Sequence, residues 1–285
     1  MTSARANSDA PSWEPHIATS AATVLVPFER LGVEGGQGRV LASWLIANAE
    51  PITFPATDPS TRVRDDQRGS QTWAMRYCGP NFFALGDKPP VISALQKAYG
   101  TVMPHMWQQT LGITVRAMGL DERAAEAFVT NPRNGESADP HTDTRPTVAG
   151  YPLPGAGLII SHCLNARDID DIRSQPATLV LPRAESLVFF RGTEHPHVGI
   201  SPDIMATDDD ETRAGKFQAA IAQFTIVDII HNLGGESGVH VKQAQQLPLK
   251  SLHGIPGFSD RVVISFNFDD GCGHGTSLDK LLSPV

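Results

Sequence analysis

The segment SLVFFRGTEHPH, residues 186–197, contains the pattern on which the fold prediction rests. Its apolar run LVFF has the length and the β-branched and aromatic content typical of a buried strand. A turn containing Gly192 follows the run and leads to two histidines, His195 and His197. The segment therefore predicts a β-strand that delivers imidazole side chains just beyond its end.

A second polar segment, DPHTD at residues 139–143, lies upstream of that strand. Because side chains alternate along an extended chain, we expect His141 and Asp143 on the same side of this segment. An imidazole and a carboxylate so placed can bind one metal ion, and a histidine from a later strand would complete the set. Two histidines and one carboxylate leave open positions on divalent iron, although zinc sites use the same ligand types.

Outward from these segments, the chain divides into a helical part and a β-rich part. Apolar spacing and helix start signals predict helices over residues 39–49, 90–99, 106–118 and 121–129. Strand-like segments follow Pro132, at residues 156–164, 177–181, 186–190, 217–230 and 261–268. We therefore predict an α+β fold with N-terminal helices packed around a β core. We expect a flexible tail over residues 1–20 and a single domain over 21–285, helical over about 21–132 and β-rich over about 133–270.

From His141 to Arg213 the sequence resembles the double-stranded β-helix of the Fe(II)/2-oxoglutarate-dependent oxygenases, a jelly-roll or cupin-like fold. The matching segments are HTD at 141–143, LIISHCLN at 158–165, ATLVLP at 177–182, ESLVFFRG at 185–192 and HVGISP at 197–202. The resemblance implies that His141, Asp143 and a distal histidine bind Fe(II). It further implies a dioxygenase that uses 2-oxoglutarate and O₂ to hydroxylate or desaturate a small molecule, with release of succinate and CO₂.

The identity of the distal histidine is open at this point. His197 is the first candidate because the Gly-x-x-Pro turn that follows it matches the family pattern. His195 and His253 are the alternatives, and a His195 that does not bind iron is expected to face the substrate.

The basic residue that binds the far carboxylate of 2-oxoglutarate is also open. Arg213 and Arg261 both match the family pattern in part, and Lys216 is a further candidate. Arginine suits the role because its planar guanidinium binds a carboxylate through two parallel hydrogen bonds. Arg145, two residues after Asp143, is expected to contact the substrate.

Composition narrows the choice of partners. The 285 residues are 40% hydrophobic and 19% charged, so a sizeable core can form. The net charge of −8 and the lack of a Lys/Arg cluster argue against nucleic-acid or anionic-membrane partners. The 3 cysteines are widely spaced, which favours reduced thiols in a cytoplasmic protein. We therefore predict a cytoplasmic enzyme with a small-molecule substrate and no apolar segment long enough to cross a membrane.

Two other functions fit the same residues. The first is a cupin-like metalloenzyme that does not use 2-oxoglutarate, which a missing carboxylate anchor would support. The second is a β-barrel that binds a small ligand without catalysis. The substrate, the oligomeric state and the role of segment 233–258 are left open by the sequence.

Overall fold

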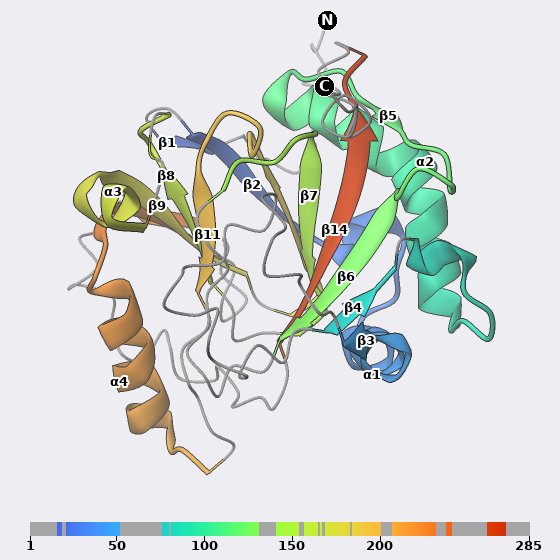
Figure 1. Cartoon of the computed structure of the whole chain (residues 1–285), viewed down its shortest axis with the longest axis horizontal. Coiled ribbons are helices and arrows are strands. Elements are labelled where there is room, and N and C mark those ends of the chain that lie inside the picture. The colour runs from blue at the N-terminus through green and yellow to red at the C-terminus, as the bar shows by residue number, and fades with distance from the viewer. Residues whose placement is uncertain are drawn as a thin grey trace, which may run out of the picture.

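The computed structural model describes most of the chain between residues 16 and 271. The described ranges are 16–18, 21–51, 76–79, 81–130, 141–153, 157–164, 166, 169–182, 184–200, 207–231, 238–240 and 261–271. Within them the chain is a mixed α/β protein, mostly sheet with few helices, and its strands form two sheets (Figure 1). None of the helices in these ranges is long and apolar enough to cross a membrane.

The larger sheet has 9 strands among the described residues, and all of its pairings are antiparallel. Eight strands form a continuous order: β1 (His16–Ala18), β2 (Ala21–Pro27), β10 (Ser186–Phe190), β7 (Thr147–Tyr151), β14 (Arg261–Asp269), β6 (Ala125–Thr130), β4 (Arg76–Cys78) and β3 (Glu50–Pro51). The remaining strand, β5 (Arg116–Ala117), pairs with the end of β14. The last strand of the described chain therefore lies inside the sheet, between β7 and β6.

The smaller sheet has 5 strands among the described residues. Their order is β11 (His197–Ile200), β8 (Gly157–Ser161), β9 (Pro176–Leu181), β12 (Thr225–His231) and β13 (Gly238–His240). The β12 strand runs parallel to β9, with a register shift between Ile226 and Asp228, whereas the other pairs are antiparallel.

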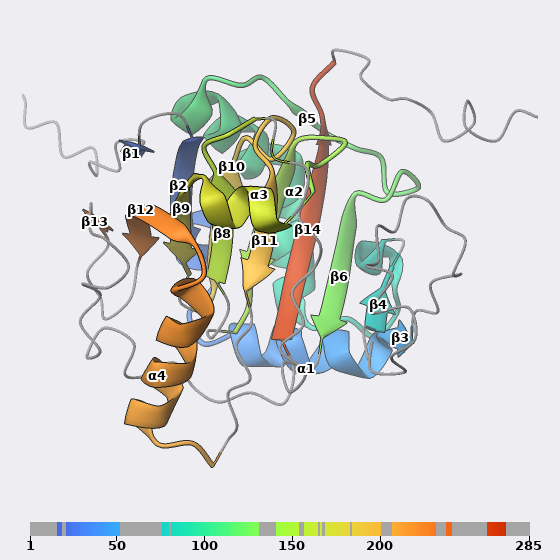
Figure 2. The same cartoon turned by 60° about the vertical axis from the view of Figure 1, so that its left-hand side comes forward.

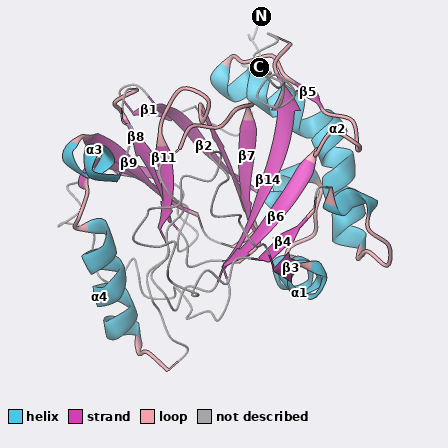
Figure 3. Cartoon of the chain, in the orientation of Figure 1, coloured by secondary structure: helices cyan, strands magenta, loops and turns pink. Residues whose placement is uncertain are grey.

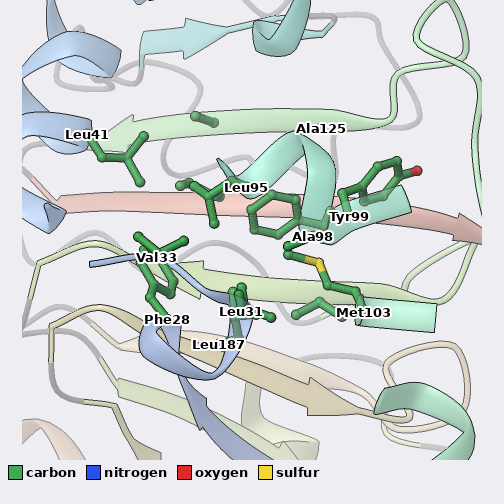
Figure 4. Close-up of a cluster of buried hydrophobic side chains, with 14 of the residues drawn as sticks. Phe28, Leu31, Val33, Leu41, Leu95, Ala98, Tyr99, Met103, Ala125 and Leu187 are labelled. Atoms are coloured by element: carbon green, nitrogen blue, oxygen red, sulfur yellow. The ribbon is translucent and has the colours of Figure 1, made fainter. Parts of the chain in front are cut away.

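Helices cover the outer face of each sheet, and the strands lie between the two helical layers (Figure 3). On the larger sheet the layer consists of α1 (Gly38–Asn48), α2 (Pro90–Leu111) and the short 3₁₀ helices η1 (Phe28–Leu31) and η2 (Phe82–Ala84). Figure 4 shows part of this core, with Leu41, Leu95, Ala98, Tyr99 and Met103 of the helices against Ala125 and Leu187 of the strands. On the smaller sheet, α3 (Ile169–Ser174) and α4 (Asp210–Ile221) form the cover (Figure 2).

The inner faces of the two sheets pack against each other. Tyr151, Val188 and Phe190 of the larger sheet form one buried cluster with Leu158, Ile160 and Val180 of the smaller sheet. Along β14 the side chains at 262, 264, 266 and 268 are buried in the helical layer, so those at 261, 263, 265 and 267 face the space between the sheets.

The helix predicted at residues 121–129 is wrong, because this segment contains β6. Ala125, Ala127 and Val129 are fully buried and alternate with Glu126 and Phe128, which is the period of a strand. The segment pairs with β14 on one side and with β4 on the other, so sheet pairing overrides the local helical preference.

The strand predicted at residues 217–230 is only half correct, because its first part belongs to α4. Asp209 caps this helix by accepting a hydrogen bond from the Thr212 amide at 2.7 Å. Ala214, Phe217 and Ile221 are buried at helical spacing, and the strand β12 begins only at Thr225.

The predicted helices at 90–99 and 106–118 are one helix, α2, which ends at Leu111. Pro104 lies inside it and removes one backbone hydrogen bond. Burial of Met103, Met106 and Trp107 around the proline holds the helix together, and Gly112 ends it with a positive φ of 67°.

Candidate metal centre

Backbone pairing brings the two predicted metal-ligand segments together. The amide of His141 donates to the carbonyl of His197 at 3.1 Å, and the amide of His197 donates to the carbonyl of His141 at 2.9 Å. The amide of Asp143 donates to the carbonyl of Gly192 at 2.8 Å. The His-x-Asp segment is therefore fixed beside the start of β11 and the turn that precedes it.

The side chains of His141, Asp143 and His197 converge, and we call these three residues the triad. One ligand atom from each lies within 4.8 Å of the others. His197 Nε2 is 3.7 Å from Asp143 Oδ1, and the two imidazole rings are 4.4 Å apart between centroids. His197 is buried and His141 is exposed, so the triad opens to solvent on the His141 side.

Neighbouring groups orient the His197 ring. Its Nδ1 donates a hydrogen bond to the carbonyl of His195 at 3.1 Å, which leaves the Nε2 lone pair directed toward Asp143. Phe190 packs edge-on against the ring at 4.8 Å between centroids. A metal-binding histidine needs such a partner on its other nitrogen to fix its tautomer and direction.

The Asp143 carboxylate is shielded in a way that suits a cation. Its Oδ2 atom is buried and has no hydrogen-bond partner. It lies where the Cβ of any residue larger than glycine at position 192 would be, since a Cβ added to Gly192 would be 2.2 Å from Oδ2. A buried, unsatisfied carboxylate oxygen is costly unless a cation or donor compensates it.

Burial also shifts the protonation of both groups. Burial raises the pKa of Asp143 to about 6, an effect opposed by His141. Burial lowers the pKa of His197 to about 3, and the charge of His141 adds to that decrease. His197 is therefore a neutral imidazole at neutral pH, which is the form that binds metals, and the donor set fits a divalent cation.

Arg261 supplies a positive charge in the space between the sheets. Its guanidinium is hydrogen-bonded to Tyr151, and its Nε atom is buried without a partner. Burial lowers the pKa of Arg261, and no carboxylate of the described residues forms an ion pair with it. A Cβ added to Gly199 would be 2.4 Å from Nη2, so the guanidinium lies directly on the β11 backbone.

The other basic candidates are placed differently. Arg213 and Lys216 lie on α4, which covers the outer face of the smaller sheet. Arg213 is 3.6 Å from Asp210, and Lys216 forms an ion pair with Asp208 at 2.8 Å. Arg145 is exposed, and its Nη1 lies 3.1 Å from the sulfur of Met118.

Of the two remaining histidine candidates, His195 does not join the triad. His195 is buried, and its Nδ1 donates to the carbonyl of Ser161 at 2.9 Å. It therefore supports His197 through its carbonyl group, and its substrate contact stays a prediction. His253 and most of segment 233–258 lie outside the described residues.

Several residues that shape the site were not identified from the sequence. Tyr151, Gly192 and Gly199 contact the triad or Arg261, as described above. The two glycines follow or lie within apolar strands, which is a signal for a close approach to the backbone. Nothing in the sequence indicated which side chain would make that approach.

No protein-family model and no curated protein matches this chain. Solved structures are similar to it, including the following two. The first is SnoN, the non-heme alpha-ketoglutarate-dependent epimerase of nogalamycin biosynthesis, with a TM-score of 0.45 and 11% identity over 90% of this chain and 82% of that chain. The second is a prolyl-4-hydroxylase of Pseudomonas putida, with a TM-score of 0.34 and 13% identity over 87% of this chain and 91% of that chain. At these values we base the function on the geometry of the site.

Proposed function

We propose that the chain is an Fe(II)- and 2-oxoglutarate-dependent oxygenase that acts on a small molecule. The observation that carries the proposal is the triad of His141, Asp143 and His197, whose ligand atoms lie within 4.8 Å of one another. The pairing of strands in two sheets that pack face to face fits a double-stranded β-helix.

The triad residues would hold the iron. Two imidazoles and one carboxylate suit Fe(II), and three protein ligands leave positions for other molecules. Bound there, Fe(II) would supply the activation of O₂ that is coupled to conversion of 2-oxoglutarate into succinate and CO₂. The protein's own contribution is to hold the ligands: His195 directs His197, and Gly192 leaves room for Asp143.

Arg261 would bind the far carboxylate of 2-oxoglutarate. His197 and Gly199 are two residues apart on β11, so they share a face and lie about 6.6 Å apart along the strand. The guanidinium of Arg261 packs on Gly199, one such step from the metal ligand. A short dicarboxylate can span this separation, with one end at the triad and the other on the guanidinium.

The contacts favour Arg261 over Arg213 and Lys216. An Arg261 side chain between the sheets, with a buried Nε and no acidic partner among the described residues, needs an anion. Lys216 already pairs with Asp208, and Arg213 lies on the outer helix near Asp210. A guanidinium also binds a carboxylate through two parallel hydrogen bonds, which a lysine cannot do.

The test is the consumption of 2-oxoglutarate by purified protein reconstituted anaerobically with Fe(II) and then supplied with O₂ and candidate substrates. The proposal predicts succinate formation that requires iron, with the Asp143→Ala variant inactive. Turnover of a substrate that needs iron but no 2-oxoglutarate would instead identify a cupin-like metalloenzyme. Full iron content and turnover in Asp143→Ala would contradict the triad.

A further inference from the structure

Three polar side chains on the smaller sheet form a hydrogen-bonded chain with no role in the function proposed above. The hydroxyl of Thr178 donates to Asp228 Oδ1 at 2.6 Å. Because this bond uses the hydroxyl proton, Thr178 Oγ1 accepts from His162 Nε2, which is 2.8 Å away. The network thus places a proton on His162 Nε2, so that the neutral ring has its lone pair on Nδ1.

These three side chains face the space between the sheets. Ile160 and Val180 belong to the inner cluster. His162 is two residues after Ile160, and Thr178 is two residues before Val180. Since side chains alternate, His162 and Thr178 share that inner face. Asp228 is in register with Thr178 on the neighbouring strand, so it shares the face as well.

The chain of side chains lies close to the triad. His197 pairs with Ile160, and His162 is two residues further along, which places its Cα about 8 Å from that of His197. The backbone connects them too, because His197 donates to the carbonyl of His195 and His195 donates to the carbonyl of Ser161. One small molecule can therefore contact both the triad and His162.

With the neutral His162 ring, the polar atoms that remain free in this group are all acceptors. Asp228 Oδ2 and His162 Nδ1 have no hydrogen-bond partner among the described residues. Asp228 is 4% exposed, and no lysine or arginine in the described part of the chain forms an ion pair with it. The basic side chain beside it is His162, whose Nε2 lies 3.7 Å from Asp228 Oδ1 and pairs with it as a cation only when the ring is protonated. A buried carboxylate beside a neutral histidine is stabilised by a ligand that brings both hydrogen-bond donors and positive charge.

We propose that His162, Thr178 and Asp228 form a binding subsite for a protonated amine of the substrate. The amine would donate to Asp228 and His162, and the carbon to be oxidised would lie at the triad. Thr178 positions the two acceptors and uses its own proton to hold Asp228. This substrate class rests on the proposed function, since it assumes that the triad is the reacting centre.

The test compares amines with alcohols of the same carbon skeleton. Phenethylamine with phenethyl alcohol, cyclohexylmethylamine with cyclohexylmethanol, and hexylamine with hexanol are titrated by ligand-observed NMR. Both the metal-free protein and the protein loaded with Fe(II) and 2-oxoglutarate are used. For at least one pair, the amine is expected to bind roughly tenfold more tightly than the alcohol, because a charge-assisted hydrogen bond exceeds a neutral one by that order.

Variants connect that preference to the subsite. Asp228→Asn removes the charge at constant shape, so the preference should fall to near unity. Asp170→Asn makes the same charge change on the exposed side of α3 and should leave the preference intact. His162→Gln keeps a donor for Thr178 but removes the Nδ1 acceptor, so it gives a second measurement if Asp228→Asn does not fold.

Each result decides the proposal. Equal binding of amine and alcohol in all three pairs overturns the subsite, and so does a preference that survives both Asp228→Asn and His162→Gln. An Asp228-dependent preference without any Fe(II)-2-oxoglutarate complex would support the subsite and contradict the proposed function. The two proposals therefore fail separately.

Discussion

The same strands present very different side chains on their two faces. On the smaller sheet the outer face carries Ile159, Leu179 and Val198 under α3 and α4, whereas the inner face carries His197 and Thr178. On the larger sheet, β14 presents valine, isoleucine and phenylalanines to the helical layer, and Arg261 to the space between the sheets.

This difference indicates that the outer faces stabilise the fold and that the inner faces bind ligands. Burying apolar side chains under the helices favours folding, whereas burying an imidazole, a carboxylate and a guanidinium between the sheets opposes it unless ligands compensate them. The inner groups have shifted pKa values because of this burial. Variants of the inner face should therefore change ligand binding, and variants of the outer faces should change the free energy of unfolding.

The largest effect is expected at the triad. His197→Ala removes one of the three proposed iron ligands and should abolish iron binding and turnover. His195→Ala is the matched control, because the carbonyl that orients His197 is retained. Its iron affinity should fall by less than the roughly 10–100-fold that loss of an orienting contact costs. Iron content measured after anaerobic reconstitution checks both variants. Iron retained in His197→Ala but lost in His195→Ala would identify His195 as the ligand instead.

The next effect belongs to the outer layer. Phe217 on α4 is fully buried under the smaller sheet, so Phe217→Ala should lower the free energy of unfolding by about 3–5 kcal/mol. The control Val227→Ala, at a position on β12 that is 36% exposed, should change it by less than about 0.5 kcal/mol. Urea unfolding of metal-free protein measures both. If Phe217→Ala lowers the free energy of unfolding by less than about 1 kcal/mol, the outer face does not have the stabilising role assigned to it.

Variants of two glycines distinguish the proposed iron site from the proposed 2-oxoglutarate site. An added methyl at Gly192 meets Asp143 Oδ2, whereas one at Gly199 meets the Arg261 guanidinium. If the added methyl costs about 1–3 kcal/mol through overpacking, the affinity for the ligand held by the displaced group falls roughly 5–150-fold. Gly192→Ala should show this loss for Fe(II), and Gly199→Ala should show it for 2-oxoglutarate with Fe(II) affinity preserved.

A suitable control for the glycines is Gly215→Ala on α4. A Cβ there meets no atom within 4 Å. The variant should keep both affinities and gain up to about 1 kcal/mol of helix stability. If Gly192→Ala and Gly199→Ala weaken the same ligand, the two groups do not act at separate positions.

The smallest effect concerns the thiol of Cys78, which lies on β4 and is buried in the core under the helical layer. Burial raises the pKa of Cys78 to about 11, and since the thiolate is the reacting form, iodoacetamide should modify Cys78 slowly at pH 8. Cys163, two residues after β8, is only partly buried and should react before Cys78. Peptide mass spectrometry over time gives both rates, and its pH series should show Cys78 reacting faster only as the pH approaches 11. Equal rates at pH 8 would mean that the helical layer opens readily.

The sequence predicted the strands whose apolar runs have only one interpretation. Residues 186–190 and 261–268 are strands, as expected from continuous or alternating apolar residues. Residues 121–129 and 217–221 were misassigned because their conformation depends on partners distant in the sequence. Pairing with β14 makes a strand of the first, and packing on the smaller sheet makes a helix of the second.

The site was predictable to a similar degree. His-x-Asp spacing and the turn after His197 indicated three residues that do lie together, while their binding of iron stays a prediction. The sequence could not separate Arg213 from Arg261, because they differ in where the fold places them. Arg213 is on the helix outside the smaller sheet, and Arg261 is on the inner face of the larger sheet. The chain of His162, Thr178 and Asp228 links three strand regions, so no local pattern could indicate it.

The most direct test of the account is an anaerobic titration of 2-oxoglutarate into the Fe(II) protein, followed by metal-to-ligand charge-transfer absorbance. The wild-type protein should develop the absorbance band, and Arg261→Leu should bind 2-oxoglutarate roughly 30-fold to several thousand-fold more weakly, which corresponds to about 2–5 kcal/mol. Arg213→Leu, on the outer helix, should lose less than about 1 kcal/mol of the free energy of 2-oxoglutarate binding. Both variants should retain iron. A wild-type protein that binds iron but forms no band, or an Arg261→Leu variant with unchanged affinity, would contradict the assignment of the space between the sheets as the cosubstrate site.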